Sequence, residues 1–316
     1  MITSSIVSSA ESIIQEVERV IVGKPNTVKK AVIAMLCKGH LLIEDIPGVG
    51  KTTLAKSLAK SIGGEFRRIQ FTPDLLPSDI TGSSVYNQKN GQFEFRPGPI
   101  FGNVVLADEI NRATPKTQSA LLEAMEESQT TTDGETRRLP QPFFVIATQN
   151  AIEMTGTYPL PEAQMDRFFA RISLGYPDRD SEAAILSQQQ VSHPLELVQN
   201  VISLDVLSEM QSLVRDIFVH ASIREYIVDV VRATRESNQF LVGASPRGSL
   251  HLMRAAQATA AVNGYDFVRP EDVKEMAGPV LAHRVIPRAE VRAKGLTTEQ
   301  VIDGILDAVK TPIPVG

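Results

Sequence analysis

The sequence predicts an α/β fold, in which a parallel β-sheet is flanked by helices, followed by a smaller all-α part. Up to about Pro177, short apolar runs alternate with segments of helical periodicity, as in strands joined by crossover helices. The runs at 103–107 and 143–147 have continuous apolar centres, which is typical of strands buried on both faces of a parallel sheet. Beyond Pro177 only helical periodicity remains. We therefore expect an α/β domain at 1–190 and a helical domain at 191–316.

The α/β part begins with two segments of helical spacing and then alternates. Strands are expected where apolar residues form short runs or alternate with polar ones, and helices where they recur every three or four positions. In chain order, the predicted elements are helices at 11–22 and 27–37, a strand at 41–43, a helix over 51–62, a strand at 66–71, a short helix or loop within 72–82, a strand at 103–107, a helix at 115–127, and strands at 143–147 and 170–174.

Two segments within this part carry hairpin signals. Asn90-Gly91 lies inside the segment at about 83–96, and Asp133-Gly134 lies inside the one at about 130–140. Both dipeptides favour tight turns, because glycine accepts a positive φ. We expect two β-hairpin insertions. Aromatic residues on the first hairpin are expected to pack against one another rather than to grip a partner, although a partner contact stays open.

The part after Pro177 contains several segments of helical spacing. Pro270, followed by Glu271 and Asp272, marks a helix start, because proline is tolerated in the first turn and acidic residues are favourable there. Residues 190–204 lack this periodicity and are the expected linker. The predicted helices are 206–218, 223–234, 246–262, 270–285 and 297–310.

Bulk composition excludes several classes of protein. The chain has 316 residues, of which 42% are hydrophobic, so about two domains with cores of their own are expected. A net charge of −5 argues against non-specific binding to nucleic acid. One cysteine cannot form an internal disulfide. The sequence has no 18-residue apolar run and no signal-peptide layout, so we expect no membrane insertion and a cytoplasmic location.

A glycine turn between a predicted strand and a predicted helix is the strongest functional signal. Backbone N–H groups of such a loop and of the helix N-terminus face phosphates, and the helix dipole favours negative charge there. Lys51 can reach the β- and γ-phosphates, and the Thr52 hydroxyl can hold Mg²⁺. The residues expected to contact the nucleotide are Pro47, Gly48, Val49, Gly50, Lys51, Thr52 and Thr53.

The motif alone is not decisive. Gly-Lys-Ser/Thr occurs by chance in about one chain in six of this length, so the strand-turn-helix context carries most of the weight. The full pattern of a phosphate-binding loop also has a glycine where this chain has Asp45. The phosphate-facing half of the loop is intact.

Polar side chains follow two further buried strands. Asp108 and Glu109 come directly after one run, and Asn150 follows the other. In an open α/β sheet the carboxyl ends of the strands face the ligand crevice. Asp108 can orient Mg²⁺ through its water shell, Glu109 can polarise the attacking water, and Asn150 can hold that water or sense the γ-phosphate. In isolation, an acidic pair that simply ends a strand at the surface would explain Asp108 and Glu109 equally well, and a turn-forming role would explain Asn150 better.

Three arginines are candidates for contact with a phosphate. Arg167 closes the α/β part and can serve a neighbouring subunit as an arginine finger, with Arg171 as the second choice. Arg247 lies in the first turn of a predicted helix, where a basic residue opposes the helix dipole. An anionic ligand explains that position better than a local carboxylate does, but the carboxylate remains an alternative.

The order of these motifs resembles that of the MoxR family of AAA+ ATPases over about residues 10–312. The matching segments are Pro-Gly-Val-Gly-Lys-Thr, Ala-Asp-Glu-Ile-Asn-Arg-Ala, Ala-Thr-Gln-Asn, Leu-Pro-Glu-Ala-Gln-Met-Asp-Arg-Phe and Ser-Pro-Arg. The resemblance implies a P-loop AAA+ core and a helical lid, with ATP and Mg²⁺ bound between subunits of a ring, by family expectation a hexamer. It assigns roles to Lys51 and Thr52 (Walker A), Asp108 and Glu109 (Walker B), Asn150 (sensor 1), Arg167 (finger), Arg247 (sensor 2, reporting lid closure), and Val22 and Gly23 (adenine contact).

The same resemblance implies a function. Such proteins act like chaperones in assembling or activating protein complexes, including metal-cofactor insertion, and are associated with partners that carry von Willebrand factor A domains. Two alternatives remain. One is a DNA-acting motor of the helicase or initiator branch, which the acidic charge and the lack of a DNA-binding appendage disfavour. The other is a nucleotide-binding scaffold that never hydrolyses ATP, which the full catalytic set disfavours. A magnesium-chelatase motor is a close cousin rather than a different class.

Overall fold

The computed structural model describes residues 2–150, 157–190 and 194–312. Within them the chain forms a five-stranded sheet with the order β2-β5-β8-β1-β9, and its strand pairings are parallel. This confirms the predicted α/β class. The strands are β1 (Leu41–Glu44), β2 (Phe66–Gln70), β5 (Val104–Asp108), β8 (Phe144–Gln149) and β9 (Ala170–Ile172).

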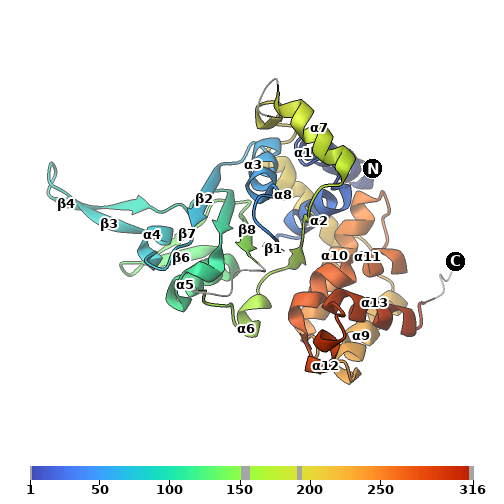
Figure 1. The fold of residues 1–316 in the computed structure, drawn as a ribbon. Helices are drawn as coiled ribbons and strands as arrows, with labels where there is room; N and C mark the ends of the chain where they lie inside the picture. Colours follow the sequence, from blue (N-terminus) through green and yellow to red (C-terminus); the bar gives the residue numbers. More distant parts are fainter. Residues whose placement is uncertain (1, 151–156, 191–193, 313–316) are drawn as a thin grey trace.

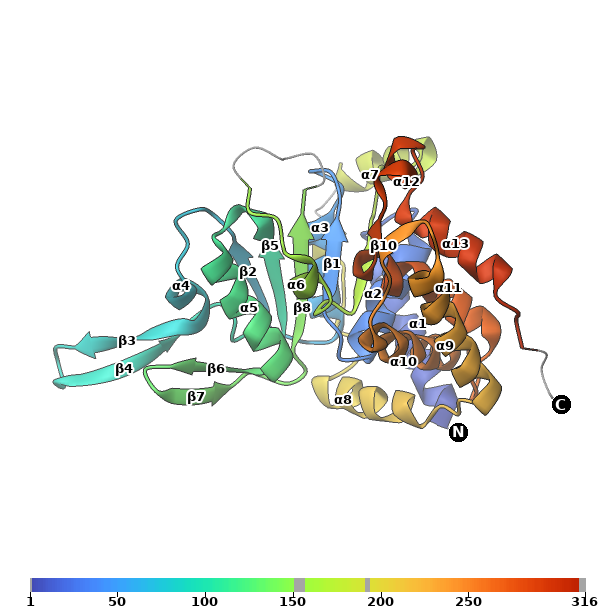
Figure 2. The same cartoon turned by 90° about the horizontal axis from the view of Figure 1, so that it is seen from below.

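Each face of the sheet is covered by its own hydrophobic core, because side chains along a strand alternate between the two faces. Leu41 and Ile43 belong to one core, and Leu42 belongs to the other. The first core contains the helices α1 (Ile2–Glu18), α2 (Pro25–Leu36) and α3 (Lys51–Ser61), and the second contains α4 (Pro77–Thr81) and α5 (Pro115–Glu127). Figure 2 shows α3 and α5 on opposite sides of the strands.

The remainder of the chain is helical, as predicted, and is continuous with the first core. Ala31 and Val32 of α2 belong to the same buried cluster as Ala255 of α10. No helix among the described residues combines the length and apolarity needed to cross a bilayer. The helices are α7 (Arg179–Gln189), α8 (Leu204–Leu213), α9 (Ala221–Glu236), α10 (Pro246–Val262), α11 (Pro270–Leu281), α12 (Ala289–Ala293) and α13 (Thr298–Ala308).

A small antiparallel ribbon also occurs in this helical part, which the sequence pattern did not predict. It pairs β10 (Phe240–Val242) with β11 (Ile286–Pro287). Each of its strands is too short to produce a recognisable alternation, so only the tertiary pairing reveals it. The short helix α6 (Glu162–Met165), which precedes β9, was also missed, because four residues are too few to show a helical repeat.

Both segments with turn signals form antiparallel hairpins that project away from the helical part (Figures 1 and 2). They are β3 (Gly82–Asn87) with β4 (Gln92–Pro97), and β6 (Gln129–Thr132) with β7 (Glu135–Arg138). On the first hairpin the rings of Tyr86 and Phe93 lie 5.3 Å apart, while Phe95 packs on Phe101 at 5.8 Å. The aromatic residues thus contact one another, yet Phe93 remains 73% exposed.

A buried histidine joins helix α5 to the central strands. The ring of His40 bridges two backbone groups, since its Nε2 lies 2.9 Å from the carbonyl of Met125 and its Nδ1 accepts the N–H of Val145 at 3.0 Å. This pairing requires a neutral ring with the proton on Nε2. Burial lowers the pKa of His40 to about 4. Burial also lowers the pKa of His251 to about 3, with a further contribution from Arg284.

The low pKa values of these two histidines predict that the folded protein loses stability in acid. Their folded pKa values lie below the ordinary value of 6.5, so the unfolded chain takes up protons first as the pH falls. The free energy of unfolding should be highest above about pH 6.5 and should fall toward pH 4, by up to about 1.4 kcal/mol per pH unit for each such histidine. Urea unfolding across this range measures the slope.

The variant His40→Gln should flatten that slope while lowering stability near pH 7 by about 1–3 kcal/mol, since it disturbs two buried hydrogen bonds. The control is His220→Gln, which replaces an exposed histidine. A slope in His40→Gln as steep as that of the parent would contradict the assignment.

Candidate functional site

A cavity of about 330 Å³ lies at the carboxyl ends of β1, β5 and β8. This is the edge of an open α/β sheet where ligands bind. It brings together residues that are distant in sequence but were predicted to act together. The lining residues are Pro47, Gly48, Gly50, Lys51, Thr52, Thr53, Asp108, Glu109 and Asn150.

The glycine turn has the backbone of a phosphate-binding loop. Gly48 has a φ of 83° and Gly50 a φ of 98°, a region that residues with a Cβ rarely adopt. A Cβ at Gly48 would meet no atom within 4 Å, so the loop is open on that side. Gly50 caps helix α3, which starts at Lys51, so the free N–H groups of the first turn and the positive end of the helix dipole face the cavity.

Lys51 is buried beside the loop. Its Nζ donates to the carbonyls of Asp45 and Ile46, both at 3.0 Å, and to Oδ1 of Asn150 at 3.3 Å. The ammonium is therefore held within the cavity by acceptors that a phosphate can replace. Asn150 also donates from Nδ2 to Oε1 of Glu109 at 3.4 Å, so it connects the lysine with the acidic strand.

Thr148 fixes the two acidic residues, and sequence reasoning missed it. Its hydroxyl donates to Oδ1 of Asp108 at 2.6 Å and accepts the backbone N–H of Glu109 at 2.8 Å. Glu109 has a φ of 58°, the left-handed region that is unusual for a residue with a side chain. This turn directs the carboxylate of Glu109 into the cavity, and the bond from Thr148 supports it.

Positive and amide groups surround both carboxylates. Arg68 on β2 donates from Nη2 to Oδ2 of Asp108 at 2.6 Å. Oε2 of Glu109 accepts from Gln70 Nε2 at 2.8 Å and from Arg112 Nη1 at 2.9 Å. The parallel pairing of β2 with β5 explains the contacts of Arg68 and Gln70, because Gln70 lies opposite Asp108 in register. Only that pairing, and no local motif, identifies Arg68 and Gln70 as neighbours.

The residues present fit Mg²⁺. Thr52 and Asp108 line the same cavity and offer a hydroxyl and a carboxylate, the hard oxygen donors that this ion prefers. Such sites in proteins use one or two side chains and complete their coordination with phosphates and water. Among the described residues, no group of three or more acidic, histidine or cysteine side chains is arranged to hold a metal ion.

A second cavity of about 210 Å³ adjoins the first, since Gly48, Gly50 and Thr53 line both. Most of the side chains that line it are apolar, with polar atoms exposed between them, a combination that suits a nucleotide base. Val22, which is expected to contact adenine, lines this cavity, whereas Gly23 does not appear in its wall. A Cβ on Gly23 would lie 2.1 Å from Oγ of Ser181, so this glycine lets α7 approach. The other lining residues are Val20, Ile21, Lys24, Val49, Gly175, Pro177, Ile185, Gln188 and Pro194.

Arg167 and Arg247 lie together elsewhere. Both contact Glu126 near the end of α5, with Nε of Arg167 3.4 Å from Oε2 and Nη2 of Arg247 2.9 Å from Oε1. Arg167 precedes Ala170, which pairs with the first residue of β1, while the glycine loop follows the last. The length of a four-residue strand, about 13 Å, therefore separates the two edges. Among the described lining residues of the first cavity, neither arginine occurs.

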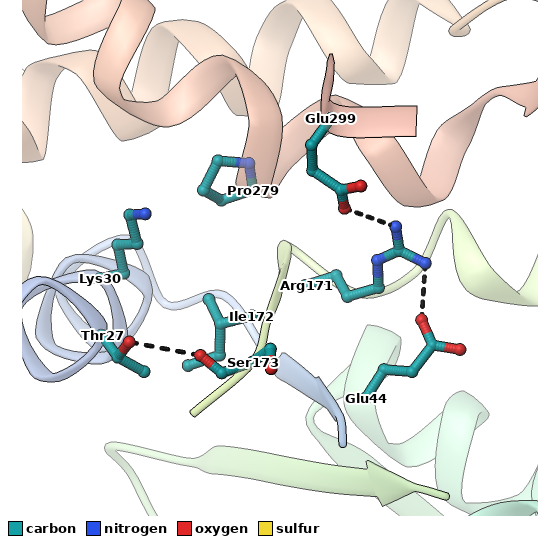
Figure 3. A pocket seen from close by; sticks show the side chains of 8 residues that line it. All are labelled: Thr27, Lys30, Glu44, Arg171, Ile172, Ser173, Pro279 and Glu299. Atoms are coloured by element: carbon teal, nitrogen blue, oxygen red, sulfur yellow. Dashed lines mark hydrogen bonds and ion pairs between the residues drawn. The ribbon is translucent and has the colours of Figure 1, made fainter. Parts of the chain in front are cut away.

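The lid holds the segment that carries Arg167. Asp166 accepts from Nε of Arg284 at 2.7 Å and from Oγ of Ser245 at 3.2 Å, and the side chain of Arg284 is only 1% exposed. Burial lowers the pKa of Arg284 to about 10, against the opposing effect of Asp166. Arg171, the second choice for a finger, lies between Glu44 and Glu299 at 2.7 Å from each (Figure 3).

Comparison with known proteins agrees with this geometry. Residues 40–170 match the profile of the ATPase family associated with various cellular activities (AAA), and residues 232–305 match that of the AAA lid domain. The chain is 42% identical over 315 residues to chaperone MoxR1 of Mycobacterium tuberculosis, covering 97% of this chain and 83% of that protein. It is 32% identical over 323 residues to protein MoxR of Paracoccus denitrificans, covering 94% and 93%.

A solved structure is similar over nearly the whole chain. A crystal structure of a protein from Cytophaga hutchinsonii superposes with a TM-score of 0.92 at 41% identity, covering 99% of this chain and 97% of that one. The uncharacterized protein YeaC of Bacillus subtilis is 51% identical over 300 residues, covering 95% and 94%. The whole fold, lid included, is therefore shared with these proteins.

The role of Thr148 is testable by Thr148→Val, which keeps the shape and removes the hydroxyl. The backbone N–H of Glu109 then loses its partner, at a cost of about 1–3 kcal/mol. We expect nucleotide affinity to change little and turnover in a phosphate-release assay to fall about tenfold or more. The control is Thr130→Val, at a buried threonine whose hydroxyl has no hydrogen-bond partner among the described residues. Equal turnover in both variants would refute the role of Thr148.

Proposed function

Because this chain belongs to the MoxR family of AAA+ ATPases, we propose that it hydrolyses ATP in a ring of identical subunits and uses this cycle to remodel partner proteins. The observation that carries the proposal is the separation of two sets of residues. Lys51, Thr52, Asp108, Glu109 and Asn150 gather in one cavity, whereas two of the three candidate arginines, Arg167 and Arg247, gather on Glu126.

ATP is proposed to bind with its phosphates on the glycine loop and its base in the adjoining apolar cavity. Lys51 exchanges the carbonyls of Asp45 and Ile46 for phosphate oxygens, which are stronger acceptors for an ammonium group. Thr52 and Asp108 would hold Mg²⁺, which when bound supplies positive charge to the phosphates. Arg68, now on Asp108, is the side chain that must adjust for this ion to bind.

The chemical step needs an oriented water and a neutralised γ-phosphate. The carboxylate of Glu109 points into the cavity and is placed to accept a proton of the attacking water. Asn150 lies between Glu109 and Lys51, so its amide can contact both the water and the γ-phosphate. Thr148 maintains Asp108 and Glu109 in their relative positions.

The remaining positive charge is proposed to come from the adjacent subunit. Arg167 lies at the opposite edge of its own sheet from its own glycine loop, so it cannot serve its own nucleotide without a large rearrangement. Arg247 and Arg167 share the carboxylate of Glu126. This shared position favours a role for both arginines at the site of the neighbouring subunit, and disfavours a role for Arg247 in reporting lid closure within its own subunit. Such a finger contributes about 10³–10⁵ in turnover.

The work done by this cycle is proposed to be chaperone-like. A relative with 42% identity carries the name chaperone, which supports that class of activity. The family resemblance adds a partner with a von Willebrand factor A domain, metal-cofactor maturation as one possible outcome, and six subunits in the ring. The exposed tip of the β3–β4 hairpin, with Phe93, is the part of the core placed farthest from the lid and so is available to a client (Figure 1).

Two substitutions separate binding from hydrolysis. Lys51→Ala should lower ATP affinity by about 100-fold or more, because it removes a charge-assisted contact. Glu109→Gln should keep ATP affinity and lower turnover about 10²–10⁴-fold, as expected on loss of a general base. Calorimetry measures the first quantity and a phosphate-release assay the second. Unchanged hydrolysis in Glu109→Gln would exclude the proposed role, and absence of hydrolysis in the parent chain would favour a scaffold.

A mixing experiment tests whether the site is shared between subunits. Arg167→Ala and Arg247→Ala should each bind ATP normally and hydrolyse it poorly. Mixed with Glu109→Gln, each should regain activity, because some interfaces then combine an intact Glu109 with an intact arginine. The control mixture pairs Lys51→Ala with Glu109→Gln. No subunit in that mixture has a complete cavity, because Lys51 and Glu109 act within the same subunit. Failure of every arginine mixture to exceed that control would show that the arginines act within their own subunit.

A further inference from the structure

Asp45 stands where the usual phosphate-loop pattern has glycine, and its carboxylate reaches across the fold. The residue is 6% exposed and directly follows β1. Oδ2 accepts from Leu174 N at 2.6 Å, Gly175 N at 2.8 Å and Ser173 Oγ at 2.9 Å. Oδ1 accepts from Ile46 N at 2.8 Å. One side chain therefore binds the phosphate loop to a segment about 130 positions later in the chain.

These donors hold the carboxylate in its charged form. Burial opposes the charge of Asp45, but the hydrogen bonds from Gly175, Ser173, Ile46 and Leu174 outweigh it and lower the pKa. Bonds to an ionised acceptor are about twice as strong as neutral ones. The link between the two segments is therefore far firmer than a loop contact at the surface.

The bound segment continues into the wall of the base cavity. Gly175 and Pro177 line that cavity, together with Ile185 on α7, which follows. Lys24 holds the same segment from the other side by donating to the carbonyl of Tyr176 at 2.7 Å, and Lys24 also lines the cavity. The position of the base-binding wall relative to the glycine loop is thus set through Asp45.

The segment also leads to the lid. Figure 3 shows Arg171 between Glu44, at the end of β1, and Glu299 on α13. Two residues later, the carbonyl of Ser173 accepts from Thr27 of α2 at 3.3 Å. Residues 171–176 therefore touch the phosphate-loop strand, the base cavity and the lid within a short stretch of chain.

We propose that Asp45 is a positioning residue that couples the phosphate cradle to the base cavity, so that binding of the whole nucleotide, and not of its phosphates alone, depends on it. The inference rests on the proposed ATPase function. It also explains why Asp45 replaces the usual glycine. The loop loses a residue with a permissive backbone and gains a carboxylate that binds residues 173–175 on the other side of the base cavity. Glycine at this place would leave the N–H groups of Leu174 and Gly175 without this acceptor.

The test compares ATP with tripolyphosphate, which has the phosphates but no base. In Asp45→Asn the side chain keeps its size, loses its charge, and turns an NH₂ group toward an N–H donor. We expect the KM for ATP to rise about tenfold, the loss of one charge-assisted bond. The Ki of tripolyphosphate as a competitive inhibitor should change less than about twofold and kcat less than about threefold, because the phosphate-facing groups are untouched.

The milder variant Ser173→Ala removes one of the donors and decides the matter if Asp45→Asn fails to fold. It should raise the KM for ATP in the same direction, by about two- to fivefold. The controls are Asp79→Asn and Ser203→Ala, which remove comparable side-chain bonds to the backbone N–H of Leu76 and of Val206, at helix starts outside the site. They should leave both constants unchanged.

An equal rise of the KM for ATP and the Ki of tripolyphosphate, or no rise of either, would overturn the coupling while leaving the ATPase intact. Lack of hydrolysis in the parent chain would instead refute the proposed function, so the two failures are distinguishable. A fall in kcat with unchanged KM would also overturn the proposal, because it would place Asp45 in the chemical step and not in recognition.

Discussion

The common direction of the strands is the constraint on which the rest of this structure depends. Because β1, β5 and β8 run parallel, the residues that follow them meet at one edge of the sheet, however distant they are in sequence. The same constraint places whatever precedes β9 at the other edge, which is where Arg167 lies. In a ring of such units, the edge that carries Arg167 in one subunit can lie against the edge that carries the cavity in the next. In the proposed ring, the parallel sheet would thus supply both halves of a site that is divided between subunits.

Within the cavity, geometry is maintained by buried polar groups more than by packing. Thr148 binds Asp108 and the backbone of Glu109, and Asn150 binds Lys51 and Glu109, so these two residues at the end of β8 connect Lys51, Asp108 and Glu109. Glu109 also adopts a backbone conformation that a side chain disfavours. Unusual backbone angles of this kind persist when the surroundings determine them, and they concentrate at functional sites.

The sequence predicted those features whose signal is local. Lys51, Asp108 and Asn150 each follow a recognisable strand, and helix α10 was predicted with the bounds that the structure has. The features it did not predict depend on pairings across the chain. Arg68 matters because β2 lies beside β5, and α7 was overlooked because its polar sequence carries only a weak apolar stripe. Asp45 was visible as a missing glycine, but its partners are set by the β1–β9 pairing.

The shared contact of Arg167 and Arg247 with Glu126 has an electrostatic consequence for assembly. Arg167 and Arg247 share one carboxylate, that of Glu126, and their side chains are 34% and 42% exposed. In the proposed ring, a triphosphate bound in the neighbouring subunit would attract both arginines, because its phosphates carry several negative charges. Bound nucleotide would then add to the attraction between subunits, and ionic strength would weaken that attraction because partly exposed charges are screened. The supply of ATP would in that case also affect how strongly the subunits of the proposed ring hold together.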